Sequence, residues 1–152
     1  MRAVIQRVKY ASVEVNNEIV SEINRGLVVL LGVGKTDTED DKRYVAEKIV
    51  NLRIFEDKER KMNLSLKDID GEILIVSQFT LYGDTRKGRR PSFVEAASYE
   101  DGKKMFESFV SFVKHIYHGK VVTGVYGADM LVKIFNDGPV TIIIDTTGKS
   151  GK

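Results

Sequence analysis

The segment Ser77-Gln78-Phe79-Thr80-Leu81 carries the residue types best suited to chemistry, because two hydroxyls and one amide follow a strongly apolar stretch. Strand ends that lead into loops are where α/β proteins place reactive groups. If the strand continues to Leu81, alternation puts Gln78 and Thr80 on one face and the other three side chains on the opposite face. The segment therefore predicts either a reactive strand end or a strand that frays into polar surface.

Thr80 is the natural nucleophile of this segment, but a threonine hydroxyl reacts poorly without a general base. The segment contains no His, Asp, Glu or Lys. His115 and His118 lie at the end of a predicted helix, where the partial negative charge of the helix terminus favours them. The chain has no cysteine, which excludes thiolate catalysis and cysteine-ligated metals. We therefore expect no catalytic triad, no metal site and no cofactor.

A basic loop follows the polar segment, with cations at Arg86, Lys87, Arg89 and Arg90. These side chains repel one another, so they must be solvated or neutralised by anions. The loop is either a solvated surface turn or a grip on the phosphates of a nucleic acid. The net charge of +2, from 24 basic and 22 acidic residues, does not decide between these interpretations.

A second polar segment, Asn136-Asp137-Gly138-Pro139-Val140-Thr141, separates two predicted strands. Asp-Gly is typical of a hairpin turn, and Pro139 removes a backbone donor where the next strand would begin. A cis Gly–Pro bond would bend the chain sharply, but only about 5–6% of X–Pro bonds are cis. From these residues alone, a trans turn is the expected conformation.

Two further motifs resemble those of nucleotide hydrolases. Gly34-Lys35-Thr36 follows an apolar strand, and Asp145-Thr146-Thr147-Gly148 follows another. A P-loop requires a glycine at position 29, where this chain has Val29. We expect instead a glycine loop that leads into a helix whose capping box is formed by Thr36 and Glu39. The segment 68–72 resembles a calcium loop, but its glycine comes too early, which favours a hairpin-type turn.

The elements that would position these residues follow from hydrophobic periodicity. The pattern predicts helices over 40–52 and 99–117, and strands over 2–8, 11–15, 19–23, 27–31, 53–55, 72–81, 121–125, 130–135 and 140–145. The run 27–31 is continuous and β-branched, which is typical of a strand buried on both faces. A chain of 152 residues with 42% hydrophobic content predicts one α/β domain over 1–152, with a polar, flexible tail at 147–152.

The apolar runs are too short to cross a bilayer, which requires roughly 20 residues. The amino-terminal residues form neither a long apolar stretch nor a cleavage site, so we see no secretory signal. The sequence therefore predicts a cytoplasmic protein that has no membrane partner.

Several of these segments, taken in order, resemble the D-aminoacyl-tRNA deacylases. The resemblance lies in residues 77–81, 88–93 and 136–141, together with the opening residues 1–8 and the segment 127–130. It covers nearly the whole chain without large gaps. Gly83 and Tyr126 depart from the pattern, because many relatives have Ala and Phe at these positions.

The resemblance implies a layered β/β/α fold with mixed and antiparallel strands and two main helices. It also implies a homodimer that hydrolyses the ester between a D-amino acid, or glycine, and the 3′ end of tRNA, a proofreading step in translation. A cis Gly138–Pro139 bond would reach into the partner's pocket, which would be built around the catalytic segment 77–80. The substrate-binding residues would be Gly138, Pro139, Arg7, Met130, Tyr126 and Asn136, and the basic loop would bind tRNA.

A mechanism without a protein base is consistent with these residues. The aminoacyl ester is already activated, and the neighbouring ribose 2′-hydroxyl can assist attack. Backbone N–H groups of Gln78, Phe79 and Thr80 would then stabilise the oxyanion. The carbonyls of Gly138 and Pro139 would receive the α-ammonium group, so that an L side chain collides with the backbone. The alternatives are a tRNA-binding module without catalysis and a small nucleotide hydrolase.

Overall fold

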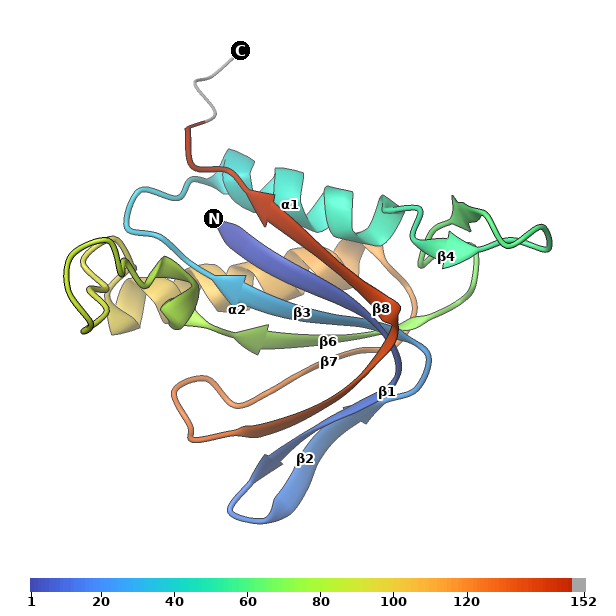
Figure 1. Ribbon diagram of the computed structural model, residues 1–152, viewed down its shortest axis with the longest axis horizontal. Helices are drawn as coiled ribbons and strands as arrows, with labels where there is room; N and C mark the ends of the chain where they lie inside the picture. The colour runs from blue at the N-terminus through green and yellow to red at the C-terminus, as the bar shows by residue number, and fades with distance from the viewer. Residues whose placement is uncertain (149–152) are drawn as a thin grey trace.

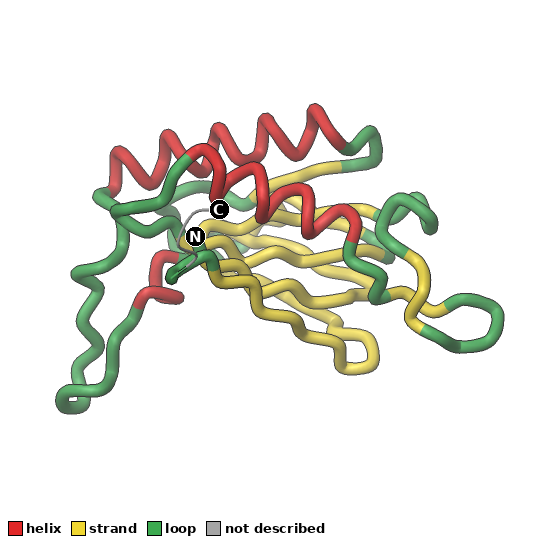
Figure 2. Tube along the Cα trace, turned by 90° about the horizontal axis from the view of Figure 1, so that it is seen from above, coloured by secondary structure: helices red, strands yellow, loops and turns green. Residues whose placement is uncertain are grey.

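A six-stranded sheet covered on one face by two helices forms the body of the protein (Figures 1 and 2). The computed structural model describes residues 1–148, so positions 149–152 of the predicted flexible tail lie outside the described residues. The strands are β1 (Arg2–Val15), β2 (Glu18–Ile23), β3 (Gly26–Gly32), β4 (Phe55–Glu56), β5 (Met62–Leu64), β6 (Glu72–Ser77), β7 (Val121–Thr123) and β8 (Leu131–Asp145). The helices are α1 (Glu39–Asn51), α2 (Tyr99–Ile116) and the short 3₁₀ helix η1 (Phe79–Tyr82).

The sheet has the strand order β2-β1-β3-β6-β7, and β8 pairs with β1. The long strand β1 pairs with β3 through its first half and with β2 through its second half, and β8 accompanies both halves. These pairs are antiparallel, whereas β3, β6 and β7 run parallel. The small sheet of β4 and β5 lies apart from this order. The mixed α/β fold with two main helices is confirmed.

Two apolar cores lie on opposite faces of the sheet. Leu27 and Val29 of β3 pack with the residues beneath α1 and α2. Val28 points the other way and packs with Val13 of β1 and Leu74 of β6. The second core exists because β2 folds over to contact β6 and β7. Burial on both faces explains the continuous apolar run of β3.

Several predicted boundaries are wrong, and the tertiary structure gives the reasons. The predicted strands 2–8 and 11–15 form one bent strand, because β8 remains paired with β1 through two register shifts. The predicted strand 72–81 ends at Ser77, because the chain turns into η1. The capping box of α1 is formed by Thr38 and Asp41 rather than by Thr36 and Glu39. Within residues 1–148, no helix combines the length and apolarity that crossing a bilayer requires.

The segment Asn136–Val140 does not form the predicted hairpin turn. It is a bulge within β8, since Val8 of β1 pairs with Asn136 and Gln6 pairs with Thr141. The chain therefore continues along β1 on both sides of the bulge (Figure 1). The Gly138–Pro139 bond is cis, contrary to the trans conformation expected from these residues alone and in agreement with the family resemblance.

Candidate active site

A cavity of about 560 Å³ opens where β3 and β6 end, next to the start of α2. Ser77, Gln78 and Phe79 line it together with residues from α2 and from the segment that precedes β8. Val33 and Val76 add apolar side chains to the wall of the cavity. The volume falls in the range of small-molecule sites, roughly 300–1,000 Å³.

The predicted catalytic segment contributes backbone groups as well as side chains. The amide of Gln78 donates to the carbonyl of Leu31 at 2.8 Å, and its side-chain amide donates to the Thr80 hydroxyl. The amides of Phe79 and Thr80 begin η1 and have no acceptor among the described residues. The strand alternation expected beyond Ser77 is therefore wrong, because the chain forms a 3₁₀ turn, whose first two amides have no acceptor among the described residues.

Within residues 1–148, no His, Asp, Glu or Lys side chain forms a hydrogen bond with Thr80. Its exposed side chain does not line the cavity, although Gln78, which does, donates to its hydroxyl. His115 stands near the far end of α2, about 24 Å along the helix from Tyr99 at the cavity. Asp129 is the one acidic residue that lines the cavity in the part of the chain described, and the sequence did not single it out.

Tyr126 and Met130 both line the cavity, as the resemblance implies. The Tyr126 ring makes edge-on contact with Tyr99, with ring centres 5.3 Å apart, and its hydroxyl donates to the Tyr99 carbonyl at 3.4 Å. A Cβ at Gly102 would lie 2.6 Å from this hydroxyl, so the glycine makes room for the phenol. Burial raises the pKa of Tyr126 above its ordinary value.

Three cavity residues of α2 escaped the sequence analysis: Tyr99, Gly102 and Phe106. The sequence places them on the apolar face of a predicted helix, and this position predicts ordinary core packing as readily as a cavity wall. Phe106 in fact belongs to the core beneath the helices as well as to the cavity wall. Periodicity alone cannot separate these two roles.

The bulge of β8 does not line the cavity of its own chain. Gly138 and Pro139 are exposed, whereas Arg7 is only 7% exposed and braces the bulge from behind. Arg7 Nε donates to the Asp137 carbonyl at 3.1 Å, and Nη1 donates to the Ile54 carbonyl at 2.8 Å. Asn136 Oδ1 accepts from the Val140 amide at 3.0 Å. These contacts hold the bulge in place and leave its tip facing outward.

The basic loop begins directly after η1 and is closed at its base. The backbones of Asp84 and Ser92 exchange two hydrogen bonds, of 2.8 and 2.9 Å. Arg86 forms a two-point pair with the Asp84 carboxylate, at 2.9 and 2.7 Å, and these hydrogen bonds hold the pKa of Asp84 well below its usual range. The cations of Lys87, Arg89 and Arg90 are exposed and have no ion-pair partner in residues 1–148.

Comparison with known proteins places the chain in one family. A family model described as D-Tyr-tRNA(Tyr) deacylase matches residues 4–145. A D-aminoacyl-tRNA deacylase of Thermosipho melanesiensis is 59% identical over 146 residues, which are 96% of this chain and 97% of that protein. The D-aminoacyl-tRNA deacylase of Clostridium perfringens is 58% identical over 147 residues, again 96% of this chain and 97% of its own.

Two solved structures share the fold. One is named c-Myc DNA Unwinding Element Binding Protein; it is 42% identical, with a TM-score of 0.92 over 96% of this chain and 99% of its own. The other, a probable eukaryotic D-amino acid tRNA deacylase, has a TM-score of 0.75 over 94% of this chain and 97% of its own, and at 21% identity it shows the fold alone. Because the family model spans residues 4–145 and the relatives are more than half identical over almost their full length, this chain belongs to the D-Tyr-tRNA(Tyr) deacylase family.

Proposed function

We propose that this protein hydrolyses the ester bond between a D-amino acid and the 3′ end of tRNA, and so releases free tRNA and the D-amino acid. The observation that carries the proposal is the high identity, over 96% of the chain, to proteins named D-aminoacyl-tRNA deacylase. The cavity beside Ser77, Gln78 and Phe79 has a size suited to an aminoacylated nucleotide end. Such a reaction removes wrongly charged tRNA before translation uses it.

The chemistry proposed for this site relies on backbone groups. The amides of Phe79 and Thr80 stabilise the oxyanion that forms on the ester carbonyl, because neither amide has an acceptor among the described residues. Gln78 does not contribute its amide, which already donates to Leu31, and its side chain orients Thr80. The ribose 2′-hydroxyl of the substrate assists attack by water. Losing one oxyanion donor typically raises the barrier by about 3–4 kcal/mol.

A second copy of the chain completes the site in this proposal. Gly138 and Pro139 are exposed and braced from behind by Arg7, yet they do not line the cavity of their own chain. In a homodimer their carbonyls accept the α-ammonium group of the substrate bound by the partner. An L side chain then collides with this backbone, whereas a D side chain or the hydrogen of glycine avoids it.

The apolar residues along β8 offer a surface on which a second copy can pack. Leu131, Phe135 and Ile143 have exposed fractions of 57%, 59% and 73%. All three residues lie on β8. Within residues 1–148, β8 pairs with β1 alone, so its other edge has no strand partner there. Exposed apolar surface of this kind is typical of protein interfaces.

The basic loop supplies the contact to the tRNA backbone in this proposal. Within residues 1–148, Lys87, Arg89 and Arg90 have no ion-pair partner, and phosphate contacts of such cations give affinity without sequence reading. Arg86 contributes less, because Asp84 already neutralises it. The resemblance implies that all four cations of the loop bind tRNA, and the proposal assigns Arg86 the smallest share.

Incubation with D-tyrosyl-tRNA and L-tyrosyl-tRNA tests the proposal, with release of the amino acid as the measurement. We expect cleavage of the D form alone. Binding of both tRNAs without release would favour a nucleic-acid-binding module, a second candidate supported by the DNA-binding name of the 42% identical structure. Release from both forms at equal rates would contradict the chiral selection, and glycyl-tRNA added to the series tests whether glycine is accepted.

A further inference from the structure

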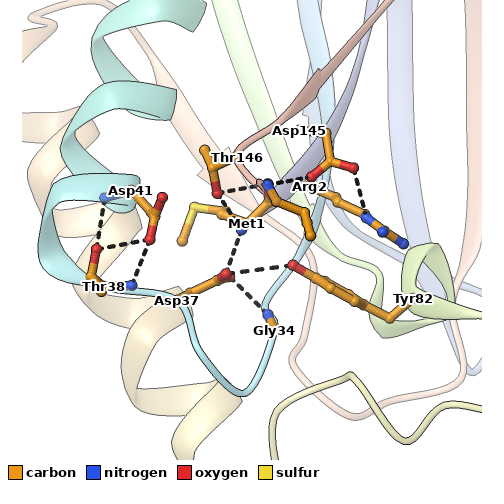
Figure 3. A network of polar contacts seen from close by, with 10 residues as sticks. Met1, Arg2, Gly34, Asp37, Thr38, Asp41, Tyr82, Asp145 and Thr146 are labelled. Atoms are coloured by element: carbon orange, nitrogen blue, oxygen red, sulfur yellow. Dashed lines mark hydrogen bonds and ion pairs between the residues drawn. The ribbon is translucent and has the colours of Figure 1, made fainter. Parts of the chain in front are cut away.

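Arg2 of β1 contacts the end of β8 and the end of η1, and Figure 3 shows it between Asp145 and Tyr82. Its Nε donates to the Asp145 carboxylate at the end of β8, at 3.0 Å. Its Nη1 donates to the carbonyl of Leu81 at 3.0 Å, and its guanidinium carbon lies 4.6 Å from the centre of the Tyr82 ring. Leu81 and Tyr82 are the last residues of η1, the short helix that begins with Phe79 and Thr80. Arg2 therefore holds the end of η1 opposite to the two exposed amides.

Gly32, the last residue of β3, and Gly34, in the β3–α1 connection, form the surface against which η1 lies. A Cβ at Gly32 would come within 3.0 Å of the Gln78 carbonyl and 3.1 Å of the Leu81 Cβ. A Cβ at Gly34 would come within 2.6 Å of the Tyr82 hydroxyl. The glycine motif that resembled a P-loop thus makes room for η1.

Asp37 supports Tyr82 from the same connection (Figure 3). Its carboxylate accepts from the Gly34 amide at 2.8 Å and from the Tyr82 hydroxyl at 3.5 Å, and it also contacts the amino group of Met1. Asp145, from the other hydrolase-like motif, orients Arg2. Residues from both motifs that resemble those of nucleotide hydrolases therefore support η1. Gly34 and the nearby Asp37 contact Tyr82, and Asp145 orients Arg2.

The helix η1 is short, so its orientation depends on contacts with neighbouring elements. It has four residues, and a 3₁₀ helix has weaker hydrogen-bond geometry than an α-helix. Before it, the Gln78 amide bonds to Leu31; after it, the chain enters the exposed basic loop. Arg2 fixes both the backbone, through Leu81, and the rotation of the turn, through the Tyr82 ring.

We propose that Arg2 is a positioning residue of the reaction, which fixes η1 through Leu81 and Tyr82 so that the amides of Phe79 and Thr80 keep their direction toward the ester. The inference rests on the proposed deacylase function. Arg2 does not line the cavity, so it acts through η1 rather than on the substrate. The side chain is 33% exposed, and the pairing of β1 with β3 and β8 is made by backbone groups, so we expect the fold to survive its loss.

The test compares Arg2→Met, Arg2→Lys and the control Arg43→Met. Arg43 is an exposed cation on α1 whose side chain makes no ion pair in the described part of the chain. We expect Arg2→Met to lower kcat for D-tyrosyl-tRNA by about 10- to 100-fold, as expected for a small misplacement of catalytic groups, with KM and Tm close to wild type. Arg2→Lys keeps the charge but loses the planar guanidinium group, so we expect its kcat to fall between those of the wild type and Arg2→Met. The control keeps the wild-type kcat.

Hydrogen exchange gives a second measurement that does not depend on activity. The Leu81 amide bonds to the Gln78 carbonyl at 3.2 Å, and the Gly83 amide bonds to the Thr80 carbonyl at 2.9 Å. We expect both amides to exchange faster in Arg2→Met and at the wild-type rate in Arg43→Met. Unchanged exchange, an unchanged kcat, or a parallel loss of kcat, KM and Tm in Arg2→Met would overturn the inference. If the wild-type protein releases no amino acid, the proposed function fails, and hydrogen exchange alone decides whether Arg2 fixes η1.

Discussion

The Phe79 amide is the group on which the proposed chemistry depends most directly. Phe79→Pro removes this donor at the first helical position, where proline is best tolerated, and Phe79→Ala removes the ring but keeps the N–H. We expect Phe79→Pro to lower kcat by about 100- to 1,000-fold, the usual effect of losing one oxyanion donor. Phe79→Ala should lower it far less. Single-turnover release of D-tyrosine measures both, and equal rates for the two variants would contradict the role of the amide.

Gly138 occupies a position that other residues do not fit. Its φ is +127°, and a Cβ there would lie 2.8 Å from the Val140 side chain and 3.0 Å from Arg7 Nη2. We expect Gly138→Ala to destabilise the protein by about 1–3 kcal/mol and to abolish deacylation, because the bulge must shift. Gly148→Ala is the matched control, since Gly148 also has a positive φ but a Cβ there would meet nothing within 4 Å among residues 1–148. Urea unfolding measures the free energy of unfolding of both variants. Equal values for Gly138→Ala and Gly148→Ala would contradict the predicted clash at Gly138.

At the scale of single elements, the start of α1 provides a clean test of the corrected capping box. The Thr38 hydroxyl accepts from the Asp41 amide, and the Asp41 carboxylate accepts from the Thr38 amide at 2.9 Å. Thr38→Ala should lower the free energy of unfolding by about 0.5–2 kcal/mol. Thr36→Ala, at the cap predicted from the sequence, should leave it unchanged. A larger loss of stability in Thr36→Ala than in Thr38→Ala would show that Thr36, and not Thr38, caps the helix.

The basic loop predicts a specific salt dependence of tRNA binding. Replacing Lys87, Arg89 and Arg90 by Ala should reduce the slope of log K against log salt concentration by about 2, because each phosphate contact to a single strand contributes about 0.7. The double variant Asp84→Asn/Arg86→Gln removes a neutral pair and keeps the net charge, so its slope should stay at the wild-type value. Filter binding at several salt concentrations measures both, and equal slopes for all proteins would exclude the loop from the interface.

At the scale of the whole molecule, a shared site makes a prediction that a single-chain site does not. Phe79→Pro damages the cavity, whereas Gly138→Ala damages the bulge that the partner would use. If the dimer exchanges these parts, the mixed dimer has one intact site and one doubly damaged site. Mixing the two inactive variants under subunit exchange should therefore restore about a quarter of wild-type activity. Half of randomly assorted dimers are mixed, and each mixed dimer has one intact site of its two. No recovery despite proven exchange would show that each chain works alone.

Much of the architecture follows from local patterns. The apolar face of α2, the continuous run of β3 and the polar residues after β6 were all predicted, because side-chain periodicity records which face of an element is buried. The segments at 77–80 and 136–141, together with the family resemblance, also directed attention to the cavity wall and to the bulge.

Only the tertiary structure decided how these segments are arranged. The bulge at Gly138 is part of β8 because β1 pairs with both sides of it, and β6 stops at Ser77 because the chain turns into η1, which lies against Gly32 and Gly34. The roles of Tyr99 at the cavity and of Arg2 behind it depend on contacts with residues far along the chain. Local sequence sets the conformation and the buried face of each element, whereas pairing and packing between distant residues determine where it ends and what it supports.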